Sequence, residues 1–356
     1  MYEFYKGKRV LVTGHTGFKG SWLCKMLLEL GAEVYGYSLT PPTKPSLFEM
    51  AGLEEKIHSK LGDVRDFAHM QKYFEEVKPQ VVFHLAAQPL VRESYKNPVE
   101  TYETNVMGTV HLLECVRMCK SVESVLNVTT DKVYENKEWV WGYREDDPLD
   151  GYDPYSNSKS CSELVTHSYI KSFFKELQIP VSTARAGNVI GGGDFAADRI
   201  VPDCIRAVEK KQPIIVRNPY STRPYQHVLE PLYVYLLIAM NQAKHKELSG
   251  YYNVGPEESD CVTTGELVTM FCDCYQDGAT WKNISEDSPV HEANFLKLDC
   301  AKLKNTFGWK PAFHVKEAIE LTVEFVKNSK TKEKVNDCME GQIGLLMQRM
   351  GMVNVQ

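Results

Sequence analysis

The chain has 356 residues, of which 43% are hydrophobic, and this length favours two lobes with one sizeable core. Its formal net charge of -6 gives no basis for binding nucleic acid through the chain as a whole, so any recognition of phosphate must be local. No stretch reads as a membrane-spanning helix and the first residues lack the apolar core of a signal peptide, which predicts a cytoplasmic protein that does not bind membranes.

Short apolar runs alternate with helix-period segments from the start of the chain. Residues 10–12 predict a first strand, apolar residues between 22 and 30 recur at helical spacing, and residues 34–35 predict a second strand. Further β-branched runs at 81–83, 125–128 and 181–184 are typical of parallel strands that are covered on both faces. The sequence therefore predicts an α/β fold with a Rossmann-type, doubly wound parallel sheet.

A glycine-rich turn, Gly14-His15-Thr16-Gly17-Phe18-Lys19-Gly20, directly follows the first predicted strand and opens the first helix. Glycine permits the sharp turn and lets a pyrophosphate approach the backbone, where free amides and the helix dipole favour its charge. We therefore expect residues 14 and 16–20 to bind a dinucleotide cofactor.

The end of the second strand indicates which dinucleotide binds. Ser38 stands where an NAD site usually carries a carboxylate, but no arginine is present for the extra phosphate of NADP, and Lys44 lies beyond a proline-rich stretch. NAD is favoured, with a weak grip on its ribose. Asp63, followed by Val64, comes after the expected third strand and either reaches the adenine or caps a helix.

Tyr155 and Lys159 are four residues apart, so a helix carries both on one face. An ammonium beside a phenol lowers the pKa of the phenol, which can then take a proton from a substrate hydroxyl as hydride leaves. Thr130, just after the fifth strand, is placed to hydrogen-bond the same hydroxyl. These three residues predict a catalytic site.

After about residue 187 the regular strand and helix patterns give way to glycines, prolines and short mixed segments. A helix pattern and a strand pattern return before residue 255. We expect a dinucleotide-binding domain over 1–187 with 228–255 returning to it, a smaller, discontinuous α+β substrate domain over 188–227 and 256–330, and a C-terminal tail over 331–356 for which we predict no role. The ten cysteines are expected to be reduced thiols, and Cys272 and Cys274 lack the partners of a zinc site, so no metal is predicted.

These motifs resemble those of the extended short-chain dehydrogenase/reductase family, and the resemblance runs from residue 8 to about 310. It also covers Leu85-Ala86-Ala87 after the fourth strand and Thr104-Asn105. It implies that Leu85, Ala86, Ala87 and Thr104 contact the cofactor, that Asn105 helps to hold the active-site helix, and that this helix packs against a partner in a homodimer or homotetramer.

Residues beyond Lys159 resemble those of nucleotide-sugar enzymes in that family, and arginine forks suit diphosphate oxygens. Arg199 and His291 could equally be surface or core residues. The resemblance implies these substrate-binding residues: Gln88, Asn188, Arg199, Arg217, Arg223 and His291.

Four longer runs, 14–23, 87–92, 139–145 and 151–156, resemble the CDP-glucose 4,6-dehydratase branch of the family. This resemblance implies a lyase that converts CDP-glucose to CDP-4-keto-6-deoxyglucose, a precursor of dideoxysugars in bacterial surface polysaccharides such as the O-antigen of lipopolysaccharide. The assignment of the cytidine base rests on the resemblance alone.

The expected reaction oxidises sugar C4, eliminates water across C5 and C6, and returns the hydride to C6. Asp131 is expected to protonate the leaving hydroxyl, and Lys132 to accept the C5 proton or stabilise the enolate; the alternative is a surface ion pair between the two. A 4-epimerase or reductase would need no such acid. A dinucleotide-sensing protein of the same fold would carry out no chemistry.

Overall fold

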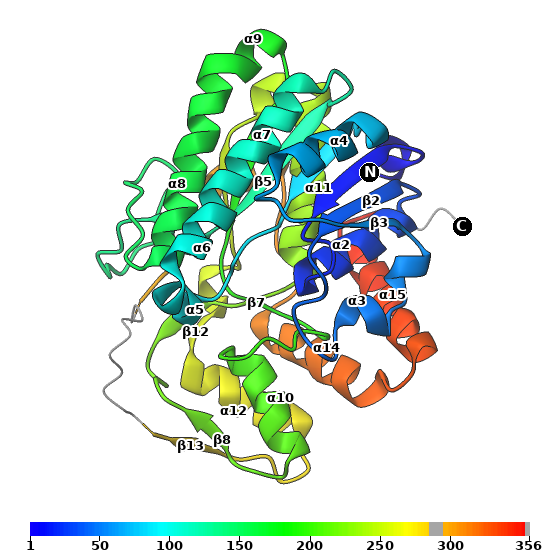
Figure 1. Cartoon of the computed structure of the whole chain (residues 1–356). Coiled ribbons are helices and arrows are strands. Elements are labelled where there is room, and N and C mark those ends of the chain that lie inside the picture. Colours follow the sequence, from blue (N-terminus) through cyan, green and yellow to red (C-terminus); the bar gives the residue numbers. More distant parts are fainter. Residues whose placement is uncertain (285–294, 353–356) are drawn as a thin grey trace.

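The computed structural model describes residues 1–284 and 295–352, so His291 lies outside the described residues. Its centre is a seven-stranded sheet in which all neighbouring strands run parallel (Figure 1). The strand order is β3-β2-β1-β4-β5-β6-β11, which confirms the predicted Rossmann-type sheet. The strands are β1 (Arg9–Thr13), β2 (Glu33–Ser38), β3 (His58–Leu61), β4 (Val81–His84), β5 (Ser124–Thr130), β6 (Val181–Ala186) and β11 (Tyr251–Val254).

Helices cover both faces of the sheet because alternate strand residues point to opposite sides. Val10 and Val12 of β1 pack in one apolar cluster, while Leu11 between them packs in the other. The first cluster contains α2 (Phe18–Glu29), α11 (Leu229–Lys244) and α15 (Lys332–Arg349), and the second contains α4 (Phe67–Val77), α7 (Gly108–Met118) and part of the segment that follows α8 (Pro154–Tyr169).

A smaller second region lies beyond the carboxyl ends of the strands, in the lower part of Figure 1. It has an apolar cluster of its own, built from segments between 190 and 225, 262 and 281, and 315 and 326. Three short strand pairs accompany its helices. Its elements are β7 (Val189–Ile190), α10 (Ile200–Glu209), β8 (Ile214–Val216), β9 (Thr222–Pro224), β10 (Gln226–His227), β12 (Cys261–Thr263), α12 (Thr264–Tyr275), β13 (Trp281–Asn283) and α14 (Val315–Asn328).

Short helices and helical turns connect these elements. They are α1 (Tyr2–Tyr5), α3 (Leu47–Met50), η1 (Leu53–Glu55), α5 (Val91–Lys96), α6 (Pro98–Tyr102), η2 (Glu103–Met107), η3 (Asp131–Val133), η4 (Ile170–Phe174), α9 (Lys175–Leu177), η5 (Lys246–Leu248), η6 (Glu258–Asp260) and α13 (Ala301–Phe307).

The C-terminal segment, for which the sequence predicted no role, forms α15 against the first helix of the sheet. Thr331 caps it by accepting a hydrogen bond from the backbone of Lys334, and buried residues such as Met339 and Ile343 join the main apolar core. Lys25 of α2 pairs with Glu340 at 2.5 Å. The segment is therefore part of the apolar core on one face of the seven-stranded sheet.

No described helix combines the length and apolar character needed to cross a membrane. The ten cysteines form no disulfide, and none is fully exposed. Within residues 1–284 and 295–352, no group of three or more His, Cys, Asp or Glu side chains has the arrangement of a metal site.

Candidate active site

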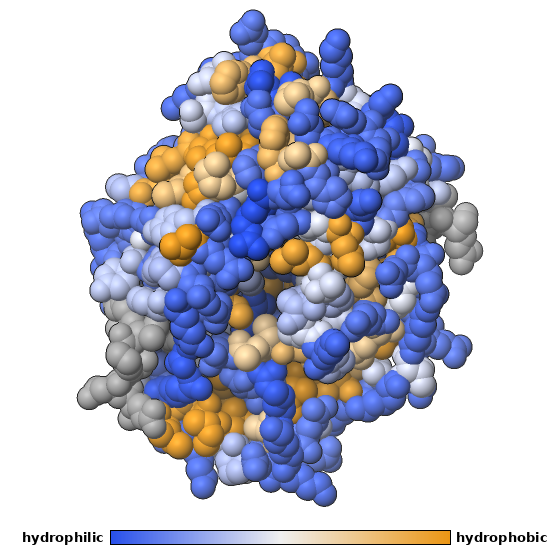
Figure 2. All heavy atoms as spheres, in the orientation of Figure 1, coloured by the Kyte–Doolittle hydropathy of each residue, from blue (hydrophilic) through white to orange (hydrophobic). Residues whose placement is uncertain are grey.

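A cavity of about 2230 Å³ lies between the carboxyl ends of the strands and the second region. Figure 2 shows the molecule hollowed at this level, with both hydrophilic and hydrophobic residues around the opening. Its volume exceeds the roughly 300–1,000 Å³ of a typical single-ligand site, so it can hold two large ligands at once. In open α/β sheets, this edge is where ligands bind.

Most of the predicted site residues line this cavity. They are Gly14, Thr16, Gly17, Phe18, Lys19, Gly20, Ser38, Asp63, Val64, Leu85, Ala86, Ala87, Thr104, Thr130, Asp131, Lys132, Tyr155, Lys159, Asn188, Arg199, Arg217 and Arg223.

The glycine turn is shaped for close backbone approach. Gly14 has φ +76°, and a Cβ there would lie 2.7 Å from the backbone nitrogen of Ala86. At Gly20 a Cβ would lie 2.1 Å from the Gly14 carbonyl oxygen. Gly17 precedes α2 without a side-chain cap, so the first backbone amides of the helix are open toward the cavity. This turn fits a pyrophosphate group.

The end of β2 carries hydroxyl groups and no carboxylate. Thr16 Oγ1 donates to the carbonyl of Leu39 at 2.9 Å and lies 2.9 Å from Ser38 Oγ. Because the single proton of Thr16 goes to Leu39, Ser38 is the donor in the second contact. The weak grip on the ribose stays a prediction.

Asp63 does not cap a helix, so that interpretation is wrong. Asp66 caps α4 by accepting a hydrogen bond from the backbone of His69 at 3.0 Å. Asp63 instead pairs with Arg65 at 2.7 Å, and hydrogen bonds from Arg65 lower the pKa of its carboxyl. Asp63 therefore holds Arg65 at the wall of the cavity, and its contact with the adenine stays a prediction.

Tyr155 and Lys159 lie on α8, as the spacing predicted, but the structure changes the expected electrostatics. Burial raises the pKa of Tyr155 to about 12, and a hydrogen bond with Thr130 opposes the rise. Burial also lowers the pKa of Lys159 to about 8, and its Nζ donates to the carbonyl of Val128 at 3.0 Å. The expected lowering of the phenol pKa by Lys159 is therefore not observed: burial raises the pKa of Tyr155, and the opposing effects come from Thr130 and Arg199.

Asp131 is buried beside Thr130, with 1% of its surface exposed, which excludes the alternative of a surface ion pair. Its Oδ1 accepts a hydrogen bond from Thr130 Oγ1 at 3.0 Å, and no described residue donates to its Oδ2. Burial raises the pKa of Asp131, although the charges of Lys132, Arg223 and Lys19 oppose the shift. The group is suited to carry a proton into the cavity.

Cationic side chains line the same cavity as Asp131. Arg223 is buried on β9 and Arg217 follows β8, where it lies 3.6 Å from Asp198. Arg92, on α5 after strand β4 of the central sheet, lies 3.7 Å from the same Asp198 oxygen. Arg92 was not predicted from the sequence, where its only signal was its place in the run 87–92. Arginines from both regions therefore line one part of the cavity.

Two other cations differ from their expected surroundings. Arg199 pairs with Asp194 at 2.9 Å. Lys19, in the glycine turn, lies 6.0 Å above the ring of Tyr235, and burial lowers its pKa to about 7, with Arg199 adding to the shift. The charge of Asp131 opposes this lowering, so Lys19 lies within electrostatic reach of Asp131.

Gln88 is absent from the described lining of the cavity. Its amide nitrogen donates to Thr101 Oγ1 at 2.9 Å, and its amide oxygen accepts from the backbone of Leu90. Asn105 joins this loop to the active-site helix, since its side chain donates to the Gln88 carbonyl and to Ser158 Oγ. Gln88 therefore orders the loop after β4.

Comparisons with known proteins agree with this geometry. The family model described as GDP-mannose 4,6 dehydratase matches residues 11–322. The chain is 50% identical over 331 residues, 91% of its length and 92% of the relative, to CDP-glucose 4,6-dehydratase of Salmonella typhimurium.

Solved structures share the fold. UDP-glucose 4-epimerase of Thermus thermophilus, solved in complex with NAD, superposes with a TM-score of 0.77 at 26% identity over 90% of this chain and 99% of that one. A dTDP-glucose 4,6-dehydratase of Bacillus anthracis, also in complex with NAD, gives a TM-score of 0.75 at 22% identity over 92% and 100% of the two chains. The chain belongs to the GDP-mannose 4,6-dehydratase family, a group of extended short-chain dehydrogenases/reductases.

Proposed function

We propose that the chain is an NAD-dependent nucleotide-sugar 4,6-dehydratase that converts CDP-glucose to CDP-4-keto-6-deoxyglucose and water. The observation that carries the proposal is the buried carboxyl of Asp131 beside Thr130, with one oxygen left without a donor among the described residues. A 4-epimerase needs no acid at this place. The 50% identity to a CDP-glucose 4,6-dehydratase supports the choice of substrate.

The cavity residues fit NAD. The glycine turn of residues 14–20 and the open amides of α2 would hold its pyrophosphate, Ser38 its ribose, and Leu85 to Ala87 its nicotinamide side. When bound, NAD accepts hydride from sugar C4 and returns it to C6. Two neighbours in the fold comparison were solved in complex with NAD.

Tyr155 removes the proton of the C4 hydroxyl, and Thr130 orients that hydroxyl. The hydrogen bond between Thr130 and Tyr155 already opposes the rise in the phenol pKa that burial causes. The Lys159 ammonium lies one helical turn away from Tyr155. It favours the phenolate form of Tyr155 further once the C4 hydroxyl is hydrogen-bonded to Tyr155 and Thr130.

Asp131 then serves as the acid of the elimination. A ketone at C4 makes the C5 proton acidic, but the C6 hydroxyl leaves only when it is protonated, and it departs as water with the proton of Asp131. The raised pKa of Asp131 favours the protonated form that this step needs. Lys132 lines the same cavity. It acts on the other reacting atoms, by accepting the C5 proton or by stabilising the charge of the enolate.

The diphosphate of the substrate binds to the arginines of the second region. Arg223 and Arg217 line the cavity on β9 and after β8, Arg199 and Asn188 lie on its wall, and guanidinium forks match phosphate oxygens. These cations and Asp131 line one cavity, so a bound diphosphate would keep its sugar within reach of Asp131.

The active-site helix also supports a homodimer. Large apolar side chains are exposed on α8, on α7 and next to them: Leu164 (53%), Phe173 (40%), Met107 (45%), Met118 (51%) and Val99 (69%). An exposed apolar surface of this kind marks an interface.

We assign the enzyme to the cytoplasm, at an early step in making dideoxysugars for the O-antigen of lipopolysaccharide.

Mass spectrometry of the product tests the proposal. Purified protein incubated with NAD and CDP-glucose should yield a product lighter by one water, and UDP-, GDP- and dTDP-glucose should react far more slowly. A product of unchanged mass that proton NMR distinguishes from CDP-glucose would identify an epimerase, and an unchanged substrate would favour a dinucleotide-sensing protein.

A further inference from the structure

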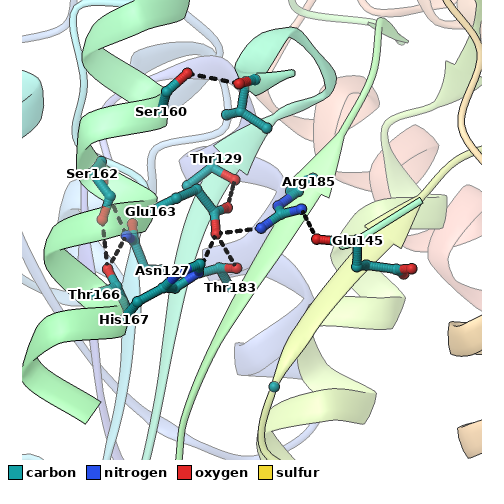
Figure 3. Close-up of polar contacts among 12 residues, drawn as sticks. Asn127, Thr129, Glu145, Ser160, Ser162, Glu163, Thr166, His167, Thr183 and Arg185 are labelled. Carbon is teal, nitrogen blue, oxygen red and sulfur yellow. Dashed lines mark hydrogen bonds and ion pairs between the residues drawn. The ribbon is translucent and has the colours of Figure 1, made fainter. Parts of the chain in front are cut away.

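A second buried carboxylate lies directly beside the reaction residues. Glu163 follows Lys159 by four residues on α8, so the two occupy one face of the helix, and the Glu163 side chain is fully buried. Figure 3 shows it reaching from α8 to the strands, where Thr129 and Arg185 point toward its oxygens. No step of the proposed reaction uses this group.

The polar atoms around Glu163 satisfy both of its oxygens. Thr129 Oγ1 donates to Oε1 at 2.5 Å, and Thr183 Oγ1 donates to Oε2 at 2.7 Å. Arg185 Nη2 donates to Oε2 at 3.0 Å from a side chain that is itself fully buried. His167 Nε2 lies 3.4 Å from the same oxygen. A carboxylate with this many donors stays ionised inside the protein.

Arg185 is fixed on its far side. Its Nη1 donates to Tyr134 Oη and to the Glu145 carbonyl, each at 2.9 Å, and the guanidinium lies over the rings of Tyr134 and Tyr251. The ion pair therefore has one orientation, with its negative end on α8 next to the turn of Lys159. The charge of Glu163 raises the pKa of Lys159 against the effect of burial.

We propose that Glu163 is a positioning residue that keeps Lys159 protonated and in place, and that Arg185 holds Glu163 for this task. The inference rests on the proposed function, because it concerns the lysine of the reaction. Three successive residues of β5 hold the same stretch of helix: Asn127 donates to Ser162 and Thr166, Val128 accepts from Lys159, and Thr129 donates to Glu163.

Other titratable groups face Lys159 and Glu163, and apart from Arg185, which is substituted together with Glu163, they stay unchanged in the variants. Around Lys159 they are Tyr155 on α8, Lys19 on α2 and His84 on β4; around Glu163 they are Arg185 on β6, His167 on α8, Tyr134 after β5 and Tyr251 on β11. Burial holds the pKa of His84 at about 3, so it is neutral over the working range, whereas Glu163 is the group among these that raises the pKa of Lys159.

The test uses the double variant Glu163→Gln/Arg185→Met, because the single variant leaves Arg185 buried without its partner and can fail to fold. Titration of lysine labelled at the ε-carbon, followed by NMR and assigned with Lys159→Arg, reports Lys159 without any substrate. We expect its pKa to fall by about one unit or more in the double variant. The alkaline limb of the kcat profile should move to lower pH by the same amount.

Two further variants separate charge from packing. Glu163→Asp keeps the anion and should keep the alkaline limb near its wild-type position. Thr183→Val removes a hydrogen bond to the same carboxylate while the charge remains, so it should lower stability and leave the limb where it is.

The proposal is overturned if the folded double variant titrates Lys159 at the wild-type pH, or if Thr183→Val moves the limb as far as the double variant does. If the wild-type protein makes no product from CDP-glucose, the proposed function fails, while the NMR titration still decides the role of Glu163.

Discussion

Two buried carboxyl groups, Asp131 just after β5 and Glu163 on α8, differ in the hydrogen bonds that they receive. Asp131 is 1% exposed, accepts one hydrogen bond from Thr130, and has an oxygen to which no described residue donates. Glu163 is 0% exposed and receives hydrogen bonds from Thr129, Thr183 and Arg185. Asp131 lines the cavity, and Glu163 lies in the packed interior behind it.

The same functional group acquires two roles from these surroundings. Burial raises the pKa of Asp131, which makes it a proton donor. Burial also acts on Glu163, but the charge of Arg185 and the hydrogen bonds outweigh it and lower its pKa to about 2. One carboxyl group can change its protonation during the reaction, and the other is a permanent charge.

The largest expected effect comes from breaking the ion pair between Glu163 and Arg185. Arg185→Met leaves the Glu163 carboxylate buried without its cation, and losing one partner of a buried ion pair costs about 3–5 kcal/mol. Urea unfolding at neutral pH measures the loss, and the double variant Glu163→Gln/Arg185→Met should recover most of it. A loss well below about 1 kcal/mol would mean that the pair is not tightly coupled.

The cavity side should respond in activity instead of stability. Asp131→Asn removes the acid, so product formation should fall by about 10²-fold or more. Its free energy of unfolding should stay equal or rise, because a poorly satisfied buried carboxyl group is replaced by a neutral one. Steady-state kinetics and urea unfolding of the same preparation check both, and wild-type turnover would favour a 4-epimerase.

A carboxylate can also be added where the cavity lacks one. Ser38→Asp places an acceptor for the ribose hydroxyls at the end of β2, and a charged hydrogen bond contributes about 1.5 kcal/mol, or roughly tenfold in affinity. Calorimetry should show tighter binding of NAD. Ser38→Ala serves as the control, and an unchanged dissociation constant in Ser38→Asp would remove Ser38 from the ribose site.

The smallest effect is the pH dependence of stability, which should have opposite signs for the two groups. The raised pKa of Asp131 means that its contribution is present below its unfolded pKa and lost as pH rises through the folded value. The lowered pKa of Glu163 means that its contribution is present above its unfolded pKa and lost as pH falls toward about 2. Urea unfolding over a series of pH values should therefore show Asp131→Asn gaining stability relative to wild type as pH rises above about 4, the unfolded pKa of an aspartate. A gain that grows toward acid pH would contradict this sign.

Much of the fold could be predicted because its signals are local. The short apolar runs predicted the places of five strands, β1, β2, β4, β5 and β6, and the glycine turn marked the start of α2. The helix α15 was missed because its flanks are charged and Met-rich, although Val335, Met339 and Ile343 recur every four residues and Thr331 provides an N-cap. That spacing is the signal that could have revealed it.

The site was harder to predict where partners are distant in sequence. Glu163 stands at helical spacing from Lys159, yet its partner Arg185 lies 22 residues further along the chain, on strand β6. Asp63 was left between two roles because a nearby residue, Asp66, supplies the helix cap. The net pKa of Tyr155 depends on burial, which the spacing of two residues does not reveal.

The role of Asp131 is tested most directly by following hydride transfer and water loss separately in a single turnover. Wild-type protein and Asp131→Asn are mixed with NAD and CDP-glucose, the absorbance of reduced nicotinamide is recorded, and quenched samples are weighed by mass spectrometry. If Asp131 is the acid of the elimination, Asp131→Asn still reduces the nicotinamide while the loss of one water is slowed by about 10²-fold or more. Water loss at the wild-type rate in Asp131→Asn would contradict this role.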